Sequence, residues 1–262
     1  MAQDSLYDVW YTFTRTLGKF LRSPARIFFQ LFGTLMFLIL FTQLFSRVTG
    51  LPGFPTGSYL ELAVGGILFL NMLNSTMQSA NAIVDEINSG YLANMLLTPV
   101  NRSAILLGRV LSDAVRFTLQ TGIVLAIAYL MGATFKTGPL GILLIFLTVT
   151  FFGIAWSGLA LTVGLATKNN ETVAAIGSII VFPLMFTSTA LLPAAFLPSW
   201  MQTASNYNPL SYAADAVRAL ITTGFNWGAI LHAYAIIALI LVVTWSATLY
   251  HFRKVVRYIH SF

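Results

Sequence analysis

The sequence from Leu140 to Ala166, LGILLIFLTVTFFGIAWSGLALTVGLA, contains no charged residue and decides the class of fold. A helix of about 20 mainly apolar residues crosses the hydrocarbon core of a bilayer, which is about 30 Å thick. Five further segments have the same character, namely Ile27–Ser46, Tyr59–Val84, Ala114–Ala133, Thr172–Leu191 and Trp227–Tyr250. The sequence therefore predicts an all-α membrane protein with six transmembrane helices.

The composition supports this prediction. Of the 262 residues, 57% are hydrophobic and only 8% are charged, whereas a soluble domain averages about 45–50% and about 25%. So little charge cannot cover a water-facing surface, which excludes a soluble globular enzyme, a disordered segment and the usual kind of nucleic-acid binder. The chain has no cysteine, which excludes disulfides, a thiolate nucleophile and a cysteine-ligated metal.

The basic residues indicate an orientation. Eleven of the 14 fall before the first predicted span, between the second and third, between the fourth and fifth, or after the sixth, while Arg47, Lys136 and Arg218 fall in the other connections. By the positive-inside rule, both termini are expected in the cytoplasm. We divide the chain into a cytoplasmic N-terminus (1–26), a six-span domain (27–250) and a basic cytoplasmic tail (251–262).

The N-terminus has the pattern of an amphipathic helix. Its apolar face follows alternating spacings of four and three residues, through Leu6, Trp10, Phe13, Leu17 and Phe20. Basic residues fall on the other faces, which is typical of a helix that lies flat in the membrane interface. This helix is expected to be either a plain anchor or a lever that also touches a cytoplasmic partner.

The connection between the second and third spans, residues 85–99, is the longest cytoplasmic piece. A short helix is predicted from Ser89 to Leu97, with Leu92, Met95 and Leu96 on one face, ended by Thr98-Pro99. This face would dock on a cytoplasmic protein or pack on the underside of the bundle itself.

The helix that follows this connection carries its own signals. Asn101 or Ser103 can cap it, and Arg109, Asp113 and Arg116 have the spacing of an ion-paired ridge.

The connection between the fifth and sixth spans lies on the opposite side. It is aromatic and broken by Pro193, Pro198 and Pro209, which favours short re-entrant helices dipping into the outer leaflet. Asp215 and Arg218 are three residues apart and are expected to pair.

One polar stripe runs along the second span, through Asn71, Asn74, Gln78 and Asn81. Amides that face lipid are costly, so this stripe is expected either to hydrogen-bond other helices, within a subunit or across a dimer, or to line a pathway. Phe37 and Phe41 begin an aromatic stripe in the first span that would face lipid or contact an apolar substrate.

The sequence offers no means of powering transport by itself. No Asp or Glu lies near the middle of a predicted span, there is no G-x-x-x-x-G-K-[ST] nucleotide loop, and no nucleophile–base set or metal-ligand spacing appears. The chain is therefore not expected to be an enzyme, and energy for pumping would enter through another polypeptide.

Several motifs resemble those of one family. Tyr59–Ile67 (YLELAVGGI) resembles that family's YLEFLVPGI, and Asp85–Arg109 resembles its E-x-G-x-L-x-x-L-L-x-T-P-V-x-R stretch and the L-L-G-R/K beyond it. Leu197–Met201 (LPSWM), Asn208–Tyr212 (NPLSY) and Asp215–Arg218 (DAVR) resemble the later motifs. The chain is thereby similar to the membrane subunit of type-2 ABC exporters, in the daunorubicin-resistance-like branch.

This resemblance implies a permease without cofactors in a prokaryotic cytoplasmic membrane. It implies pairing with a second copy or a paralogue, contact with membrane lipids, and two cytoplasmic ATPase subunits that bind ATP and Mg. Residues 7–21 and 85–102 would contact the ATPases, and residues 192–220 would cap the exit. The coupling residues implied are Asp85, Glu86, Gly90, Leu92, Met95, Leu96, Thr98, Pro99 and Arg102, with Trp10, Phe13 and Leu17 on the interfacial helix. Asn208, together with the prolines and the ion pair already named, belongs to the outer region.

The function expected from this resemblance is ATP-driven export of a lipophilic or amphipathic substrate, such as a drug, lipid or glycolipid. A polysaccharide is the alternative substrate, and a passive channel or membrane scaffold is the alternative class. The loop before Gly90 carries less charge than is usual in relatives, so the contact with the ATPase is expected to be less ionic.

Overall fold

The computed structural model describes every residue except 1, 46, 48, 50–57, 98–100 and 260–262. Within those ranges the chain is helical and contains no strand. The elements are α1 (Ala2–Leu21), α2 (Pro24–Leu44), α3 (Tyr59–Asn88), α4 (Tyr91–Leu96), α5 (Arg102–Leu130), α6 (Gly138–Thr167), α7 (Asn170–Phe186), the 3₁₀ turn η2 (Ala194–Phe196), α8 (Ser199–Ser205), α9 (Pro209–Thr222) and α10 (Trp227–Ile259).

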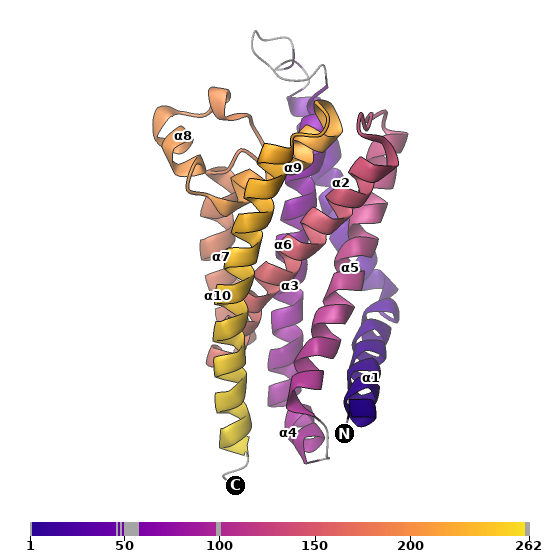
Figure 1. The fold of residues 1–262 in the computed structure, drawn as a ribbon, viewed down its shortest axis with the longest axis vertical. Coiled ribbons are helices and arrows are strands. Elements are labelled where there is room, and N and C mark those ends of the chain that lie inside the picture. Colours follow the sequence, from indigo (N-terminus) through magenta and orange to yellow (C-terminus); the bar gives the residue numbers. More distant parts are fainter. Residues whose placement is uncertain (1, 46, 48, 50–57, 98–100, 260–262) are drawn as a thin grey trace.

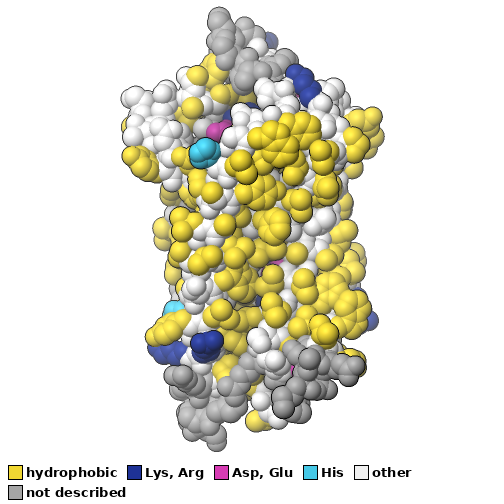
Figure 2. Space-filling model, in the orientation of Figure 1, with side chains coloured by type: hydrophobic (Ala, Val, Ile, Leu, Met, Phe, Trp, Pro, Cys, Tyr) yellow, Lys and Arg dark blue, Asp and Glu magenta, His cyan; other side chains and the backbone are white. Residues whose placement is uncertain are grey.

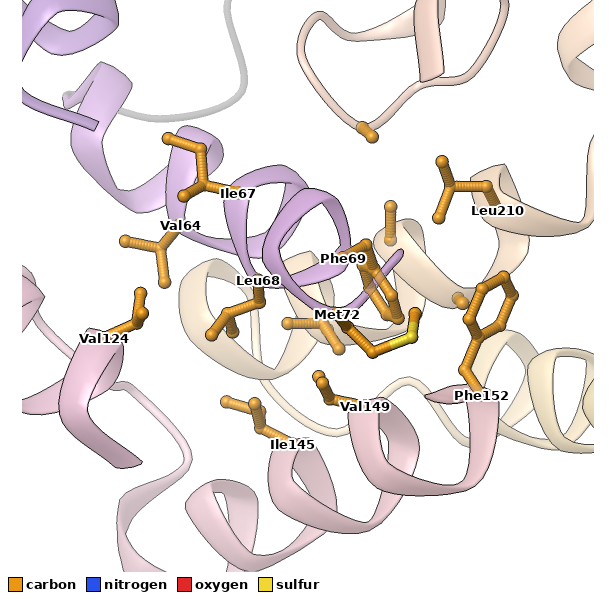
Figure 3. Close-up of a cluster of buried hydrophobic side chains, with 14 of the residues drawn as sticks. Val64, Ile67, Leu68, Phe69, Met72, Val124, Ile145, Val149, Phe152 and Leu210 are labelled. Carbon is orange, nitrogen blue, oxygen red and sulfur yellow. The ribbon is translucent and has the colours of Figure 1, made fainter. Parts of the chain in front are cut away.

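The long helix α3 lies at the centre of the bundle and contacts α2, α4, α5, α6, α7 and α9. Figure 1 shows both termini and α4 at one end, which we call the termini end, and α8 at the opposite end, which we call the outer end. Side chains of α3 meet those of α5, α6 and α9 in the core, as Figure 3 shows for Phe69, Val124, Phe152 and Leu210.

Five helices are long and apolar enough to cross a membrane, namely α2, α3, α5, α6 and α10. They correspond to five of the six predicted spans. Figure 2 shows a mainly hydrophobic middle on the visible face, with basic side chains towards the two ends. The chain is therefore a multi-pass membrane protein.

The predicted fifth span is shorter than expected. Its helix α7 has 17 residues and ends at Phe186 rather than Leu191. The next residues form a turn because their polar groups bond to other elements. Thr189 Oγ1 donates to Asp215 of α9 at 2.8 Å, and the Tyr59 hydroxyl of α3 donates to the Leu191 carbonyl at 3.1 Å. These bonds replace a continuing helix.

The sixth span continues beyond its predicted end. Helix α10 extends to Ile259, so residues 251–259 are helical and prolong the span. Phe252, Val255 and Val256 are buried in one apolar cluster with residues of α3, α4, α5 and α6. Apolar packing therefore holds this segment on the bundle.

Helix α1 packs against α5 through a small-residue contact. A Cβ added at Gly108 would lie 2.6 Å from Thr12 Cβ and 2.8 Å from the Val9 carbonyl oxygen. Trp10 of the predicted interfacial face is 62% exposed, and Phe13 and Leu17 are half-buried, so the bundle leaves much of that face uncovered. Close backbone approach thus selects the buried face of α1.

Candidate functional site

Glu86 is the centre of a buried ion-pair network at the termini end. Its carboxylate Oε1 pairs with Arg15 and, at 3.2 Å, with Lys19 Nζ, and its Oε2 pairs with Arg109. The two first partners come from α1 and the third from α5, while Glu86 itself belongs to α3. The side chain of Glu86 is only 9% exposed. One carboxylate therefore ties three helices together in a medium where ion pairs are weakly screened.

Helix α4 joins this network through Tyr91. The Arg15 guanidinium carbon lies 3.9 Å from the centre of the Tyr91 ring, and Lys19 Nζ lies 5.3 Å from it. Gly90 has φ 71°, a left-handed conformation that lets the chain leave α3 and begin α4 without steric strain. We call Arg15, Lys19, Glu86, Tyr91 and Arg109 the Glu86 hub.

A second polar layer lies deeper in the bundle. Asp113 pairs with Arg116 at 2.9 Å and accepts a hydrogen bond from Ser79 Oγ at 2.5 Å. Arg116 also donates to the Ser75 carbonyl at 2.9 Å. The predicted pairing of Asp113 with Arg116 is thus confirmed, whereas Arg109 turns to Glu86. Because Asp113 bonds the Ser79 hydroxyl and Arg116 bonds the Ser75 carbonyl, both on α3, this layer clamps α5 to α3.

These groups surround a cavity of about 360 Å³, which we call the vestibule. Its wall includes Lys19, Gln78, Glu86, Arg109 and Arg116. Asp85 lies at its edge, is exposed, and accepts a hydrogen bond from Asn170 Nδ2 at 2.6 Å. Asp85 and Glu86, adjacent in the sequence, therefore have opposite surroundings.

The apolar face of α4 packs inside this chain. Leu92, Met95 and Leu96 are buried against residues of α3, α5, α6 and α10. Leu97, which follows α4, is 80% exposed. The alternative of packing on the bundle's own underside is therefore the arrangement that the structure has.

Three further predictions concern the ends of this loop. Thr98 and Pro99 lie outside the described residues. Arg102 begins α5, and Asn101 caps that helix by accepting from the Ser103 amide at 3.2 Å. The predicted cap is confirmed.

A groove of about 670 Å³ lies between α2 and α3. Its lining combines aromatic, small and amide residues, namely Phe29, Gln30, Gly33, Thr34, Phe37, Leu70, Asn71, Asn74 and Gln78. Amides also bond across three helices: Gln120 donates to Gln30 at 3.2 Å, and Gln30 donates to Asn71 at 3.3 Å. The polar stripe therefore both bonds neighbouring helices and lines a groove.

The remaining stripe residues lie differently. Asn81 is half-buried and is not part of the groove lining. Phe37 and Phe41 belong to the predicted aromatic stripe of the first span. Their rings stack with centres 4.0 Å apart and pack against the core, so this aromatic stripe does not simply face lipid.

Another polar cluster, which we call the Asp215 cluster, holds the outer end together. Asp215 pairs with Arg218 at 2.7 Å, as predicted, and accepts from Thr189 Oγ1 at 2.8 Å. Asn208 caps α9 by accepting from the Leu210 amide at 2.9 Å and also donates to the Leu184 carbonyl at 2.6 Å. These bonds join α9 to the turn that follows α7.

The three outer prolines stand at element starts. Pro193 and Pro198 precede η2 and α8, and Pro209 is the first residue of α9. At these positions the missing amide hydrogen costs no helical hydrogen bond.

Sequence reasoning missed the interhelical partners. It placed Arg15 and Lys19 on the basic face of the interfacial helix, assigned Arg109 to an ion-paired ridge with Asp113, and passed over Gln30 and Gln120. Isolated amides within apolar segments are a detectable signal, because their burial requires a partner. Which helices meet at Glu86 has no such signal in one sequence. Among the described residues, no group of three or more His, Cys, Asp or Glu side chains could hold a metal ion.

Comparisons with known proteins agree with this architecture. The family model described as ABC-2 type transporter matches residues 7–222. The chain is 27% identical over 213 residues to the daunorubicin resistance ABC transporter permease protein DrrB1 of Streptomyces coeruleorubidus, covering 80% of this chain and 74% of that protein. It is 29% identical over 203 residues to the putative transport permease ycf38 of Cyanophora paradoxa, covering 76% and 69%.

A mycobacterial relative has a similar level of identity. The chain is 27% identical over 209 residues to the probable doxorubicin resistance ABC transporter permease protein DrrC of Mycobacterium tuberculosis, covering 79% of this chain and 75% of that protein. The chain therefore belongs to the ABC-2 type transporter family, as a non-catalytic transmembrane permease subunit that binds no cofactor and works with a partner ATPase, which handles ATP.

Proposed function

We propose that this chain is the membrane subunit of an exporter that moves a lipophilic or amphipathic molecule out of a prokaryotic cell. It would pair with a second copy or a paralogue and with two cytoplasmic ATPase subunits, with both termini in the cytoplasm. Two relatives are described as daunorubicin and doxorubicin resistance permeases, which supports this substrate class. The observation that carries the proposal is the Glu86 hub.

The hub provides a mechanical link from the termini end into the bundle. Arg15 and Lys19 connect α1 to α3, Tyr91 connects α4 to α1, and Arg109 connects α5 to α3. A buried charge without its partner is costly, so a displacement of α1 or α4 is transmitted to α3 and α5 rather than breaking the hub. An ATPase that pushes on this end would thereby change the shape of the membrane helices.

The groove supplies a route for the substrate. Its amides and aromatic rings suit a molecule with both polar and apolar parts. We propose that Asn71, Asn74 and Gln78 line the pathway, either within one subunit or where two subunits meet. The outer helices α8 and α9 would cap its exit.

A pair of adjacent leucines tests the ATPase contact. Leu97→Asp places a charge at an exposed position, so we expect loss of ATPase co-purification and of ATP-dependent transport with an unchanged melting temperature. Leu96→Asp places a carboxylate at a buried position, so we expect this substitution, unlike Leu97→Asp, to lower the melting temperature. Normal ATPase binding by Leu97→Asp would contradict this contact.

Reconstitution tests the class of function. In proteoliposomes, we expect the chain alone to be silent and transport to require the partner ATPase and ATP. Conductance or leak by the chain alone would instead show a passive channel.

A further inference from the structure

A groove of about 470 Å³ lies between α5 and α6, and we call it the α5–α6 groove. Its lining includes Gly122, Ala126, Tyr129, Phe135 and Phe146. Apart from Tyr129, every lining residue is Gly, Ala, Leu, Ile, Phe or Pro. A buried water molecule needs two to four polar partners, so these side chains do not form a site for ordered water.

The α5–α6 groove lies between two points at which hydrogen bonds fix the surrounding helices. Near the middle of both helices, the hydroxyls of Thr118 and Thr150 bond each other at 3.1 Å and join α5 to α6. The connection between the two helices lies at the outer end (Figure 1) and is attached to α9, because Thr137 Oγ1 donates to the Leu220 carbonyl at 2.7 Å. The lining residues fall between these two attachments along each helix.

The groove faces away from the core of this chain. Val124 of α5 and Ile145 of α6 are fully buried and lie against α3 in the core (Figure 3). In the groove, by contrast, Ala126 is exposed and Phe146 is half-buried. Both helices are long and apolar enough to cross a membrane, so hydrocarbon chains rather than water surround the open side of the groove.

An empty groove of this kind is unfavourable. Atoms that line a void lose the dispersion contacts that a neighbouring group would give them. Polar and charged groups do not suit apolar walls, because they would lose their hydrogen bonds there. The group that fits is therefore a hydrocarbon chain, which the membrane itself supplies.

The outer end of the groove also has a cation beside it. Lys136 directly follows Phe135, is exposed, and takes part in none of the ion pairs between described residues. Glu61, an acid that bonds the same connection, accepts from the Thr134 amide at 3.2 Å. Tyr129 is 67% exposed at this end, as is typical of aromatic residues at the level of lipid headgroups. A lipid phosphate would therefore meet a positive charge here.

We propose that the α5–α6 groove binds one acyl chain of a glycerophospholipid whose phosphate lies beside Lys136. The bound chain fills the space between α5 and α6 and completes the packing of their outer halves. The proposal requires only that α5 and α6 cross the membrane and does not depend on export, so each can fail without the other.

Native mass spectrometry of the full chain counts bound lipid directly. The protein is purified in detergent, dioleoyl phosphatidylcholine is added, and the fraction of chains that retain one lipid is followed as the collision energy rises. Ala126→Phe fills the groove from an exposed position, and Gly122→Leu fills it beside Phe146, whose Cζ would lie 3.5 Å from an added Cβ. Each should lower the retained fraction about fivefold.

Two further variants make the test specific. Ile123→Phe is the matched control, because it adds a ring at the exposed neighbour of Gly122, outside the groove lining, and should leave the retained fraction unchanged. Lys136→Gln removes the charge beside the groove and should lower the fraction about twofold.

Several outcomes would overturn the proposal. Retention that is unchanged in both groove variants, or lowered equally by Ile123→Phe, would exclude an acyl-chain site in the groove. An unchanged fraction in Lys136→Gln would exclude the position given to the phosphate. The same spectra report the oligomeric state, so a lipid-free dimer that dissociates in both groove variants would show that a second copy of the chain fills the groove instead.

Discussion

At the scale of single residues, Asp85 and Glu86 show that two adjacent acids on one helix can have opposite surroundings. The family resemblance of the stretch from Asp85 to Arg109 implies a coupling role for both. Successive residues on a helix point about 100° apart, so Glu86 faces α1 and α5 while Asp85 is exposed. A single sequence identifies the pair as important but not which acid is buried.

This difference predicts unequal effects of two similar substitutions. Glu86→Gln leaves three cations without their carboxylate, and breaking a buried pair costs about 3–5 kcal/mol. We expect a melting temperature lower by about 10 °C, measured on the purified chain in detergent. Asp85→Asn, the matched control, should shift it little. Equal shifts would contradict the assignment of Glu86 as the centre of the hub.

At the scale of elements, α1 shows that amphipathic spacing identifies a helix more reliably than its buried face. The spacing of Trp10, Phe13 and Leu17 predicts the helix, which the structure confirms. The contact with α5, however, depends on Gly108, where backbones approach closely. A missing side chain on another helix leaves no trace in the spacing of α1 itself.

A methyl group at this contact should separate the two helices. In Gly108→Ala, the added Cβ meets Thr12, and overpacking costs about 1–3 kcal/mol. We expect a longer distance between nitroxide labels at Thr14→Cys and Leu111→Cys, two exposed positions, measured by pulsed electron spin resonance in this cysteine-free chain.

The control for this experiment is Gly18→Ala on α1. An added Cβ there meets nothing within 4 Å, so the label distance should stay as in the unsubstituted protein. An unchanged distance in Gly108→Ala would show that α1 does not depend on this contact.

At the scale of the whole molecule, the two polar clusters lie at opposite ends of the bundle. The Glu86 hub joins α1, α3, α4 and α5, and the Asp215 cluster joins α9 to the turn after α7. If the chain crosses the membrane six times, these clusters lie on opposite sides.

Labelling of single cysteines tests this topology. We expect Tyr207→Cys, at the outer end, to react with a membrane-impermeant maleimide in intact cells. Asn94→Cys, on the exposed side of α4 at the termini end, should react only after permeabilisation. Reaction of both in intact cells would contradict the predicted orientation and the six crossings.

Local sequence alone predicts the all-helical membrane class, five of the six apolar spans and the family motifs. These properties depend on hydrophobic length and local spacing, which one segment carries alone. Tertiary structure decided the end of α7, the burial of the apolar face of α4, and the convergence of Arg15, Lys19 and Arg109 on Glu86. These features arise from contacts between segments far apart in the chain, where packing and the need to pair buried polar groups outweigh local preference.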